Sequence, residues 1–227
     1  VPWDRANGAH LVIQVEGIKP SFTALAAPPP FAYSEQVSTP ISKSKLRKAM
    51  RARRRELAAA CPDAAQRAAD HLPLDQLPAF GCFSGYQPQG AELDPGPLLR
   101  RLASTGAVLA LPSADRADGP LNFRVWNGRD ALVPDSFGVP APPPTAPLVR
   151  PDLIVCPLGA FDGSGLRLGQ GGGHYDRTIE ALRASGSVFV LGLAYAGQQV
   201  EAIAAEAHDQ RLDAILTESG YMAVSKD

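Results

Sequence analysis

The residue types best suited to binding an anion lie between Gly159 and Arg177, in the sequence GAFDGSGLRLGQGGGHYDR. This stretch holds seven of the 21 glycines of the chain. Glycines let backbone N–H groups approach an oxyanion because no Cβ stands in the way. Arg167 and Arg177 are fixed cations suited to phosphate, and the Asp176 carboxylate could hold a magnesium ion that bridges phosphates. The stretch therefore predicts a phosphate-binding loop.

A buried strand and a helix are expected on either side of these glycines. Residues 152–157 form a largely apolar run, which is typical of a strand buried on both faces. Residues 175–184 have the composition of a helix. A helix that begins directly after the loop adds partial positive charge at its N-terminus, which favours a bound anion.

Neither of two common phosphate-binding patterns fits the loop. The dinucleotide pattern G-x-G-x-x-G fails because His174 stands where its third glycine belongs. The P-loop pattern fails because no Gly-Lys-Ser or Gly-Lys-Thr follows the glycines. Glycine density alone is also typical of a flexible surface loop. The interleaved Arg167, His174, Tyr175 and Asp176 favour a binding loop, since flexible linkers seldom concentrate such side chains.

A longer string resembles the signature of a known family. It runs Pro157-Leu-Gly-Ala-Phe-Asp162 and then Gly165-Leu-Arg-Leu-Gly-Gln-Gly-Gly-Gly-His-Tyr-Asp-Arg177. It is similar to the signature of the 5-formyltetrahydrofolate cyclo-ligases, also called 5,10-methenyltetrahydrofolate synthetases, and the resemblance extends from about Ser42 to the C-terminus. It implies an enzyme that converts 5-formyltetrahydrofolate to 5,10-methenyltetrahydrofolate with ATP as co-substrate and Mg²⁺ as cofactor. ADP and phosphate would be released after phosphorylation of the formyl oxygen, a poor leaving group.

The resemblance also implies roles for individual residues. ATP would be bound by Lys43, Arg47, Arg167, Leu168, Gly169, Gln170, Gly171, Gly172, Gly173, His174 and Tyr175. Folate would be contacted by Gln87, Glu92, Gln170, Gly171, Gly172, Gly173 and His174. Asp176 and Asp209 match the family's magnesium-binding aspartates, and Arg167 and Asp176 would be catalytic. Without the resemblance, Glu92 and Asp209 would be interpreted as exposed surface acids.

Two positions depart from the family pattern. The residue before Tyr175 is often tyrosine in relatives and is His174 here. An imidazole can still pack on a pterin or donate a hydrogen bond, and it can titrate near neutral pH. The segment 138–141 lacks an acidic residue that many relatives carry beside the proline.

A basic helix is expected over residues 43–60, with Ser42 as its N-cap. Residues 43–55 carry eight basic side chains and no acidic one, so the rest of the chain sums to −9 (−1 minus +8). An apolar stripe at helical spacing comprises Leu46, Met50 and Leu57. Another face carries basic residues at intervals of four, four and three: Lys43, Arg47, Arg51 and Arg54.

Three interpretations of this basic face remain open: a solvated surface, a nucleic-acid contact and a phosphate contact. A nucleic-acid contact is not expected, because no aromatic residue is interleaved with the basic ones. In the cyclo-ligases a first helix with a K-x-x-x-R pattern contributes to the ATP site, and Lys43 and Arg47 match that pattern. Arg51 to Arg55 have no such assignment and are interpreted as solvated.

The order of the expected elements indicates a three-layer α/β/α fold with a mostly parallel central sheet. Further helices are expected over 63–71, over 93–103 and, as a short helix, up to Glu206. Further strands are expected over 79–86, 107–112, 121–126, 187–195 and 213–217, and an irregular connection over 134–151. The acidic and basic candidates follow strands or begin helices, so we expect them to meet at the carboxyl ends of the strands. They are Glu92, Arg167, Asp176 and Asp209.

The composition is that of a globular protein, with 45% hydrophobic and 20% charged residues among 227. The sequence has no apolar run near the ~20 residues needed to cross a bilayer and no signal-peptide pattern. Three widely spaced cysteines argue against a disulfide or zinc framework and favour a reducing cytoplasm. Two of them, Cys82 and Cys156, lie in apolar runs and are expected in the core.

Residues 1–40 are proline-rich and weakly apolar, so we expect them to be a disordered extension. The catalytic domain would then span residues 41–227. We expect a cytoplasmic monomer whose partners are ATP and 5-formyltetrahydrofolate, with or without added glutamates. A non-catalytic nucleotide- or folate-binding protein of the same fold is the alternative.

Overall fold

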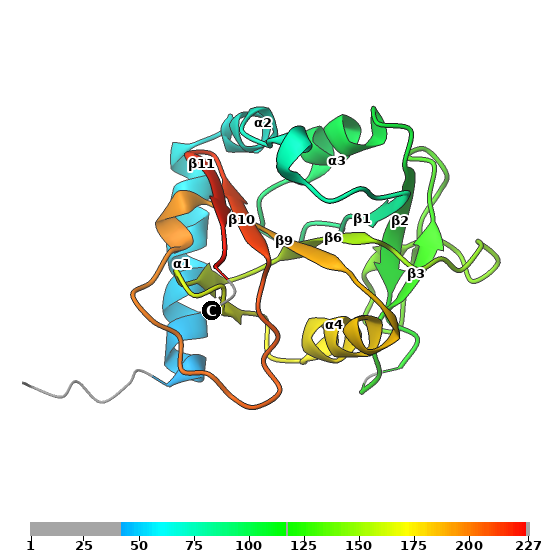
Figure 1. Ribbon diagram of the computed structural model, residues 1–227. Coiled ribbons are helices and arrows are strands. Elements are labelled where there is room, and N and C mark those ends of the chain that lie inside the picture. The colour runs from blue at the N-terminus through cyan, green and yellow to red at the C-terminus, as the bar shows by residue number, and fades with distance from the viewer. Residues whose placement is uncertain (1–41, 117, 226–227) are drawn as a thin grey trace, which may run out of the picture. The chain divides into compact units, whose positions relative to one another are not determined.

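The central feature of the computed structural model is a twisted sheet that runs through the middle of the molecule (Figure 1). The structure describes residues 42–116 and 118–225, and within them the sheet has seven strands in the order β11-β10-β9-β6-β1-β2-β3. Their bounds are β1 (Cys82–Ser84), β2 (Val108–Ser113), β3 (Asn122–Val125), β6 (Leu153–Pro157), β9 (Phe189–Leu193), β10 (Ala214–Thr217) and β11 (Gly220–Ala223). The five inner strands are parallel, and the edge strands β3 and β11 are antiparallel to their neighbours.

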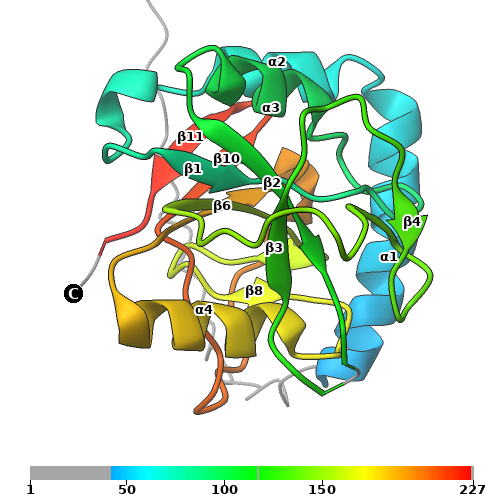
Figure 2. The same ribbon diagram turned by 90° about the vertical axis from the view of Figure 1, so that its right-hand side faces the viewer.

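The helices form two layers, one on each face of the sheet, and a further helix runs past one end of it (Figures 1 and 2). Their bounds are α1 (Lys43–Ala60), α2 (Ala64–Asp70), α3 (Gly96–Ala103) and α4 (His174–Ser185), with short 3-10 turns at η1 (Leu74–Gln76) and η2 (Ala196–Gln198). α2 and α3 pack on one face through Ala68 and Leu102, and α4 packs on the other through Ile179. The predicted three-layer α/β/α fold is confirmed.

α1 is the helix at the end of the sheet, and its predicted N-cap and apolar stripe are both present. The Ser42 Oγ accepts a hydrogen bond from the Lys45 amide at 3.4 Å, which satisfies one free donor of the first turn. Met50 is 8% exposed and packs with Leu168 and Ile203 in a small cluster beneath the helix. The rest of the stripe is partly buried. This packing determines which face of α1 points toward the carboxyl ends of the parallel strands.

The glycine-rich stretch is not one continuous loop, because it contains a short hairpin. β7 (Ala160–Phe161) pairs with β8 (Arg167–Leu168), and the Asp162 carboxylate organises the turn between them by accepting from three donors of residues 164–166. A Cβ on Gly165 would lie 2.8 Å from Val224, so that glycine serves packing. Only residues 169–173 remain as a loop facing solvent. A second hairpin, β4 (Val133–Pro134) with β5 (Pro140–Ala141), interrupts the connection expected to be irregular.

The prediction of a short helix that extends to Glu206 is wrong. Beyond η2 the backbone is tied to the β7 hairpin, since Val200 donates to the Phe161 carbonyl at 2.8 Å and Ile203 donates to the Asp162 carboxylate at 2.9 Å. These bonds use amide donors that a helix would need. The last strand, β11, was not expected, and it is a short antiparallel return after β10.

The remaining expectations concern the cysteines, the first forty residues and membrane spans. Cys156 is buried in the core, as predicted, and Cys82 is half-buried against it. The segment 1–40 lies outside the described residues. Among the helices of the described part, none is long and apolar enough to span a bilayer.

Candidate active site

A cavity of about 640 Å³ lies beside the carboxyl ends of the parallel strands. α1, the loop after β1, the glycine loop, the start of α4 and the segment 206–209 all contribute to its wall. Every site residue implied by the resemblance lines this one cavity: Lys43, Arg47, Gln87, Glu92, Arg167, Leu168, Gly169, Gln170, Gly171, Gly172, Gly173, His174, Tyr175, Asp176 and Asp209. Arg177, which the sequence also suggested as a phosphate-binding cation, does not line it and donates to the Gly172 carbonyl at 2.8 Å. The expected convergence of Glu92, Arg167, Asp176 and Asp209 is confirmed.

The glycine loop presents backbone rather than side chains to the cavity. Gly171 (φ 110°) and Gly173 (φ 66°) have left-handed conformations that side-chain-bearing residues rarely adopt. Gly173 is also the N-cap of α4, so the free amides of the first helical turn follow the loop directly. The Arg47 Nε donates to the Gly169 carbonyl at 3.0 Å and brings a guanidinium against the loop. This arrangement suits a polyanion such as a phosphate chain.

Leu168 contributes to this loop differently from its neighbours. Its side chain is 1% exposed and belongs to the cluster beneath α1, so only its backbone can serve a ligand.

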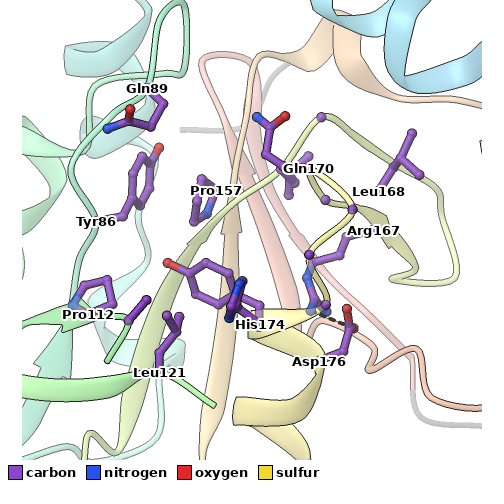
Figure 3. A pocket seen from close by; sticks show the side chains of 18 of the residues that line it. Tyr86, Gln89, Pro112, Leu121, Pro157, Arg167, Leu168, Gln170, His174 and Asp176 are labelled. Carbon is purple, nitrogen blue, oxygen red and sulfur yellow. Dashed lines mark hydrogen bonds and ion pairs between the residues drawn. The ribbon is translucent and has the colours of Figure 1, made fainter. Parts of the chain in front are cut away.

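Arg167 and Asp176 form a partly buried ion pair at the base of the loop (Figure 3). An Arg167 guanidinium N–H donates to the Asp176 Oδ1 at 2.7 Å, and another donates to the Gln210 carbonyl. The Gln210 amide donates to the same Asp176 oxygen at 3.0 Å. The Arg167 side chain is 3% exposed, so its charge acts with little screening by water. The second carboxylate oxygen of Asp176 has no protein partner within the part of the chain that the structure describes.

Lys43 and Asp209 form a second ion pair at the wall of the cavity. The Lys43 Nζ lies 2.7 Å from the Asp209 Oδ2 and 3.2 Å from the Glu206 Oε1. Burial alone would raise the pKa of Asp209, but the hydrogen bonds from Lys43 and from the Glu206 amide hold it below its usual value. Burial alone would lower the pKa of Lys43, but its hydrogen bonds to Asp209 and Glu206 raise it. Both groups therefore carry full charge near neutral pH.

The stability that this pair contributes should be constant between pH 5 and pH 9. Because the pKa of folded Asp209 is lowered, its contribution is present above the unfolded value of about 3.9 and is lost as the pH falls through the folded value. Because the pKa of folded Lys43 is raised, its contribution is present below about 10.4 and is lost as the pH rises through the folded value. A double-mutant cycle of Lys43→Met and Asp209→Asn, read by thermal melting, should give about 1 kcal/mol of coupling across this window. A coupling that changes between pH 6 and pH 8 would contradict this assignment.

Glu92 is not the exposed loop acid that its sequence context suggests. Its side chain is 5% exposed. The Oε1 accepts from Arg54 at 3.3 Å and from the Gln170 side-chain amide at 3.1 Å, and the Oε2 accepts from the Gln89 backbone amide at 2.9 Å. The carboxylate is thus held at the cavity wall by three separate segments. Gln87 lines the same wall.

The interpretation of Arg51 to Arg55 as solvated is wrong for Arg54, whereas Arg51 is exposed as expected. Arg54 is 7% exposed and pairs with Glu92, and Arg51 donates to the Gln170 side-chain oxygen at 3.1 Å. The signal was present in the spacing, since both arginines share a face with Lys43 and Arg47. Gln198, which had no signal in the sequence, donates to the carbonyls of residues 158 and 159 at 2.9 Å each and fixes the start of the glycine-rich stretch.

The cavity has an apolar wall opposite the charged one. Figure 3 shows Tyr86, Pro112 and Leu121 on one side and Arg167 with Asp176 on the other. The Tyr86 hydroxyl donates to the Leu93 carbonyl, and burial raises the pKa values of Tyr86 and the nearby Tyr175 well above their usual range. Both tyrosines are therefore neutral near physiological pH. An apolar wall of this kind suits a flat heterocycle.

His174 occupies the edge between the two walls. Its ring meets Phe137 edge to face with centroids 5.0 Å apart, and its Nδ1 lies 3.1 Å from the Gly119 carbonyl oxygen. The ring is half-buried, so it is not a loop histidine that faces only solvent. A Cβ on Gly172 would lie 2.9 Å from this ring, which leaves little room for a side chain at that glycine.

The fold and the site together define an α/β protein in which one cavity contains a glycine loop suited to phosphate and an apolar surface. The sequence profile of the 5-formyltetrahydrofolate cyclo-ligase family matches residues 40–218. The 5-formyltetrahydrofolate cyclo-ligase of Mycolicibacterium smegmatis is 34% identical over 187 residues, which cover 79% of this chain and 95% of that protein. The enzyme of the same name from Escherichia coli K12 is 32% identical over 161 residues, covering 69% and 86%.

A solved structure supports the same family assignment. The NMR structure of Aquifex aeolicus 5,10-methenyltetrahydrofolate synthetase superposes with a TM-score of 0.64 at 25% identity, over 82% of this chain and 95% of that one. The chain belongs to the 5-formyltetrahydrofolate cyclo-ligase family and is a ligase of folate metabolism. The resemblance noted in the sequence is confirmed. Each of these relatives bears an enzyme's name, so the comparisons give no support to the non-catalytic alternative.

Proposed function

We propose that this protein cyclises 5-formyltetrahydrofolate to 5,10-methenyltetrahydrofolate at the expense of ATP, within the cavity described above. The observation that carries the proposal is that one cavity holds a glycine loop with cations on one wall and an apolar surface with a buried carboxylate on the other. ATP phosphates suit the first wall and a pterin suits the second. We assign this activity to the domain spanning residues 41–227.

The chemistry requires the formyl oxygen to become a leaving group. In the proposed sequence, this oxygen attacks the γ-phosphorus of ATP, and ADP departs with the electrons of the broken P–O bond. N10 of the folate then attacks the formyl carbon and loses its proton. Expulsion of the former formyl oxygen as phosphate completes the five-membered ring and its amidinium cation. No nucleophilic side chain is needed, so the protein's task is alignment and charge stabilisation.

The residues of the charged wall supply that stabilisation in the proposal. The N–H groups of residues 169–173 and of the first turn of α4 face the phosphates, and Lys43 and Arg47 contribute positive charge beside them. Arg167 is the buried cation nearest the base of the loop, and Asp176 fixes its guanidinium. Glu92 and Gln87 offer polar contacts to the folate from the other wall and Gln170 offers one from the glycine loop, while His174 and Tyr175 flank the boundary.

The side chains around the loop fit a magnesium ion. Mg²⁺ prefers carboxylate oxygens together with substrate phosphates, and Asp176 and Asp209 both line the cavity. Ligand atoms of Glu206, His208 and Asp209 lie within 4.8 Å of one another, and Asp176 has one oxygen not engaged by the described residues. We propose that Asp176 and Asp209 hold the ion. When bound, it would neutralise charge on the ATP phosphates.

The proposal extends to the setting of the reaction. All of the residues invoked come from one chain, so a monomer suffices. The cysteines of the described part are free thiols, which supports a cytoplasmic location. The substrate is 5-formyltetrahydrofolate, with or without added glutamates, and no nucleic acid takes part.

The proposal is tested by mixing purified protein with 5-formyltetrahydrofolate and Mg-ATP while recording the absorbance of the methenyl product. We expect the chromophore to appear together with one ADP and one phosphate per molecule of product. Omitting ATP, or replacing it with an analogue whose β,γ-bridge is nitrogen, should abolish product. Tight binding of both ligands with no product would favour the non-catalytic alternative.

A further inference from the structure

Arg54 is a buried cation that does not line the cavity, yet it pairs with a carboxylate that does. Its NH1 lies 3.3 Å from the Glu92 Oε1 and 3.5 Å from the Leu158 carbonyl oxygen. The two side chains are 8% and 5% exposed, and the Arg54 Nε is buried with no hydrogen-bond partner among residues 42–116 and 118–225. Taking two charged groups out of water costs several kcal/mol each, so a fold-stabilising role alone is a weak account of such a pair.

The position of this ion pair suggests what it serves. It joins α1 to the loop after β1 at the point where Glu92 reaches the cavity wall. We propose that Arg54 is a positioning residue that fixes the Glu92 carboxylate for binding of 5-formyltetrahydrofolate. This inference rests on the proposed function, and it adds a residue to which the family resemblance assigns no role.

The fixed carboxylate also holds the Gln170 side chain, whereas the backbone of the glycine loop is contacted by Arg47. The Glu92 Oε1 accepts from the Gln170 side-chain nitrogen at 3.1 Å, and the Gln170 side-chain oxygen accepts from Arg51 at 3.1 Å. Gln170 lies between two exposed glycines, which leave it little backbone restraint of its own. Arg54 therefore fixes the carboxylate that accepts a hydrogen bond from the Gln170 side chain. It acts through that carboxylate and does not contact the substrate itself.

The guanidinium geometry makes arginine hard to replace at this site. Both contacts, to Glu92 and to the Leu158 carbonyl, are made by one nitrogen, NH1, which the planar guanidinium holds in a fixed orientation, whereas a lysine ammonium is a single flexible charge. Arg54→Lys should therefore restore only part of the function lost in Arg54→Met. The neighbouring Arg55 is exposed, and Arg55→Met is the matched control on the same helix.

The deciding measurement is the affinity for 5-formyltetrahydrofolate without ATP, by calorimetry, alongside the KM values for both substrates. For Arg54→Met we expect the dissociation constant and the KM for the folate to rise about tenfold, with Arg54→Lys between it and the wild type. The KM for ATP and the kcat at saturating folate should stay within about twofold. Arg55→Met should match the wild type in all four quantities.

A double variant separates positioning from a general structural effect. If Arg54 acts only through Glu92, then Arg54→Met combined with Glu92→Gln should bind folate within about twofold of Glu92→Gln alone. The double variant leaves neither charge buried without its partner, so it decides the question even if Arg54→Met does not fold.

Losses that add in the double variant, or a single variant whose two KM values rise together, would overturn the inference. A wild-type protein that does not bind the folate would instead contradict the proposed function.

Discussion

Replacing Asp176 with asparagine is expected to lower kcat by about a hundredfold or more, while the protein still unfolds cooperatively. Two effects combine in this variant. The proposed magnesium site loses a charged oxygen that a hard cation prefers. The buried Arg167 guanidinium also loses its counter-charge at 2.7 Å, although the amide oxygen can still accept from it and from the Gln210 N–H. The second effect should lower stability by about 1–3 kcal/mol.

Steady-state kinetics with magnesium varied, together with thermal melting, measure both effects. Glu180→Gln is the matched control, because Glu180 is an exposed acid on the same helix. The control should keep wild-type kcat and melting temperature. Near-wild-type turnover of Asp176→Asn at ordinary magnesium concentrations would show that Asp176 is neither a required metal ligand nor a required partner of Arg167.

Replacing Gly171 with valine is expected to raise the KM for ATP about tenfold or more, or to eliminate turnover, with only a small loss of thermal stability. Gly171 has φ 110°, where a β-branched residue is strained by roughly 1–3 kcal/mol. Its Cβ would also lie 3.5 Å from the Arg47 guanidinium, within the wall proposed for the phosphates. The backbone strain would thus shift the amides, and the valine methyl groups beyond the Cβ would crowd the cation that the nucleotide needs.

The control for this prediction is Gly163→Val in the β7–β8 turn. Gly163 has no positive φ, and a Cβ there would meet nothing within 4 Å. ATP kinetics and melting of the control should equal those of the wild type. If Gly171→Val has unchanged ATP kinetics, the loop does not bind the nucleotide. If its melting temperature falls steeply instead, the glycine serves folding rather than phosphate binding.

The sequence does not determine which glycines of this loop have left-handed conformations. A run of three glycines indicates that left-handed conformations are needed, but it does not say at which position. The structure has them at Gly171 and Gly173, while Gly172 is restricted by the His174 ring instead. Likewise, the density of glycine marked residues 159–173 as one loop, although Gly165 is required by packing against Val224.

The residues that line the cavity were easier to predict than the residues that hold them in place. Lys43, Arg47 and Glu92 were predicted because they match short motifs of the family, and all three line the cavity. The role of Arg54 was missed although it shares a face with Lys43 and Arg47, because its burial depends on how α1 packs against the end of the sheet, which spacing alone does not report. Gln198 was missed for the same reason, since a lone glutamine after a strand has no distinctive spacing.

The fold class was predictable because buried parallel strands have continuous apolar runs, as in β6 and β9. The error at Glu206 has a physical cause that lies far away in sequence. The Asp162 carboxylate and the Phe161 carbonyl accept the amides of Ile203 and Val200, and these tertiary bonds override any local helical tendency.

The proposed reaction requires the cavity to align the γ-phosphate of ATP with the formyl oxygen of the folate. The most direct test follows that oxygen with ¹⁸O, placed in the formyl group of 5-formyltetrahydrofolate before reaction with Mg-ATP in unlabelled water. Mass spectrometry of the phosphate released should then find one ¹⁸O atom in each molecule. Phosphate without label, formed alongside the methenyl product, would show that the formyl oxygen is not phosphorylated and would contradict the proposed reaction.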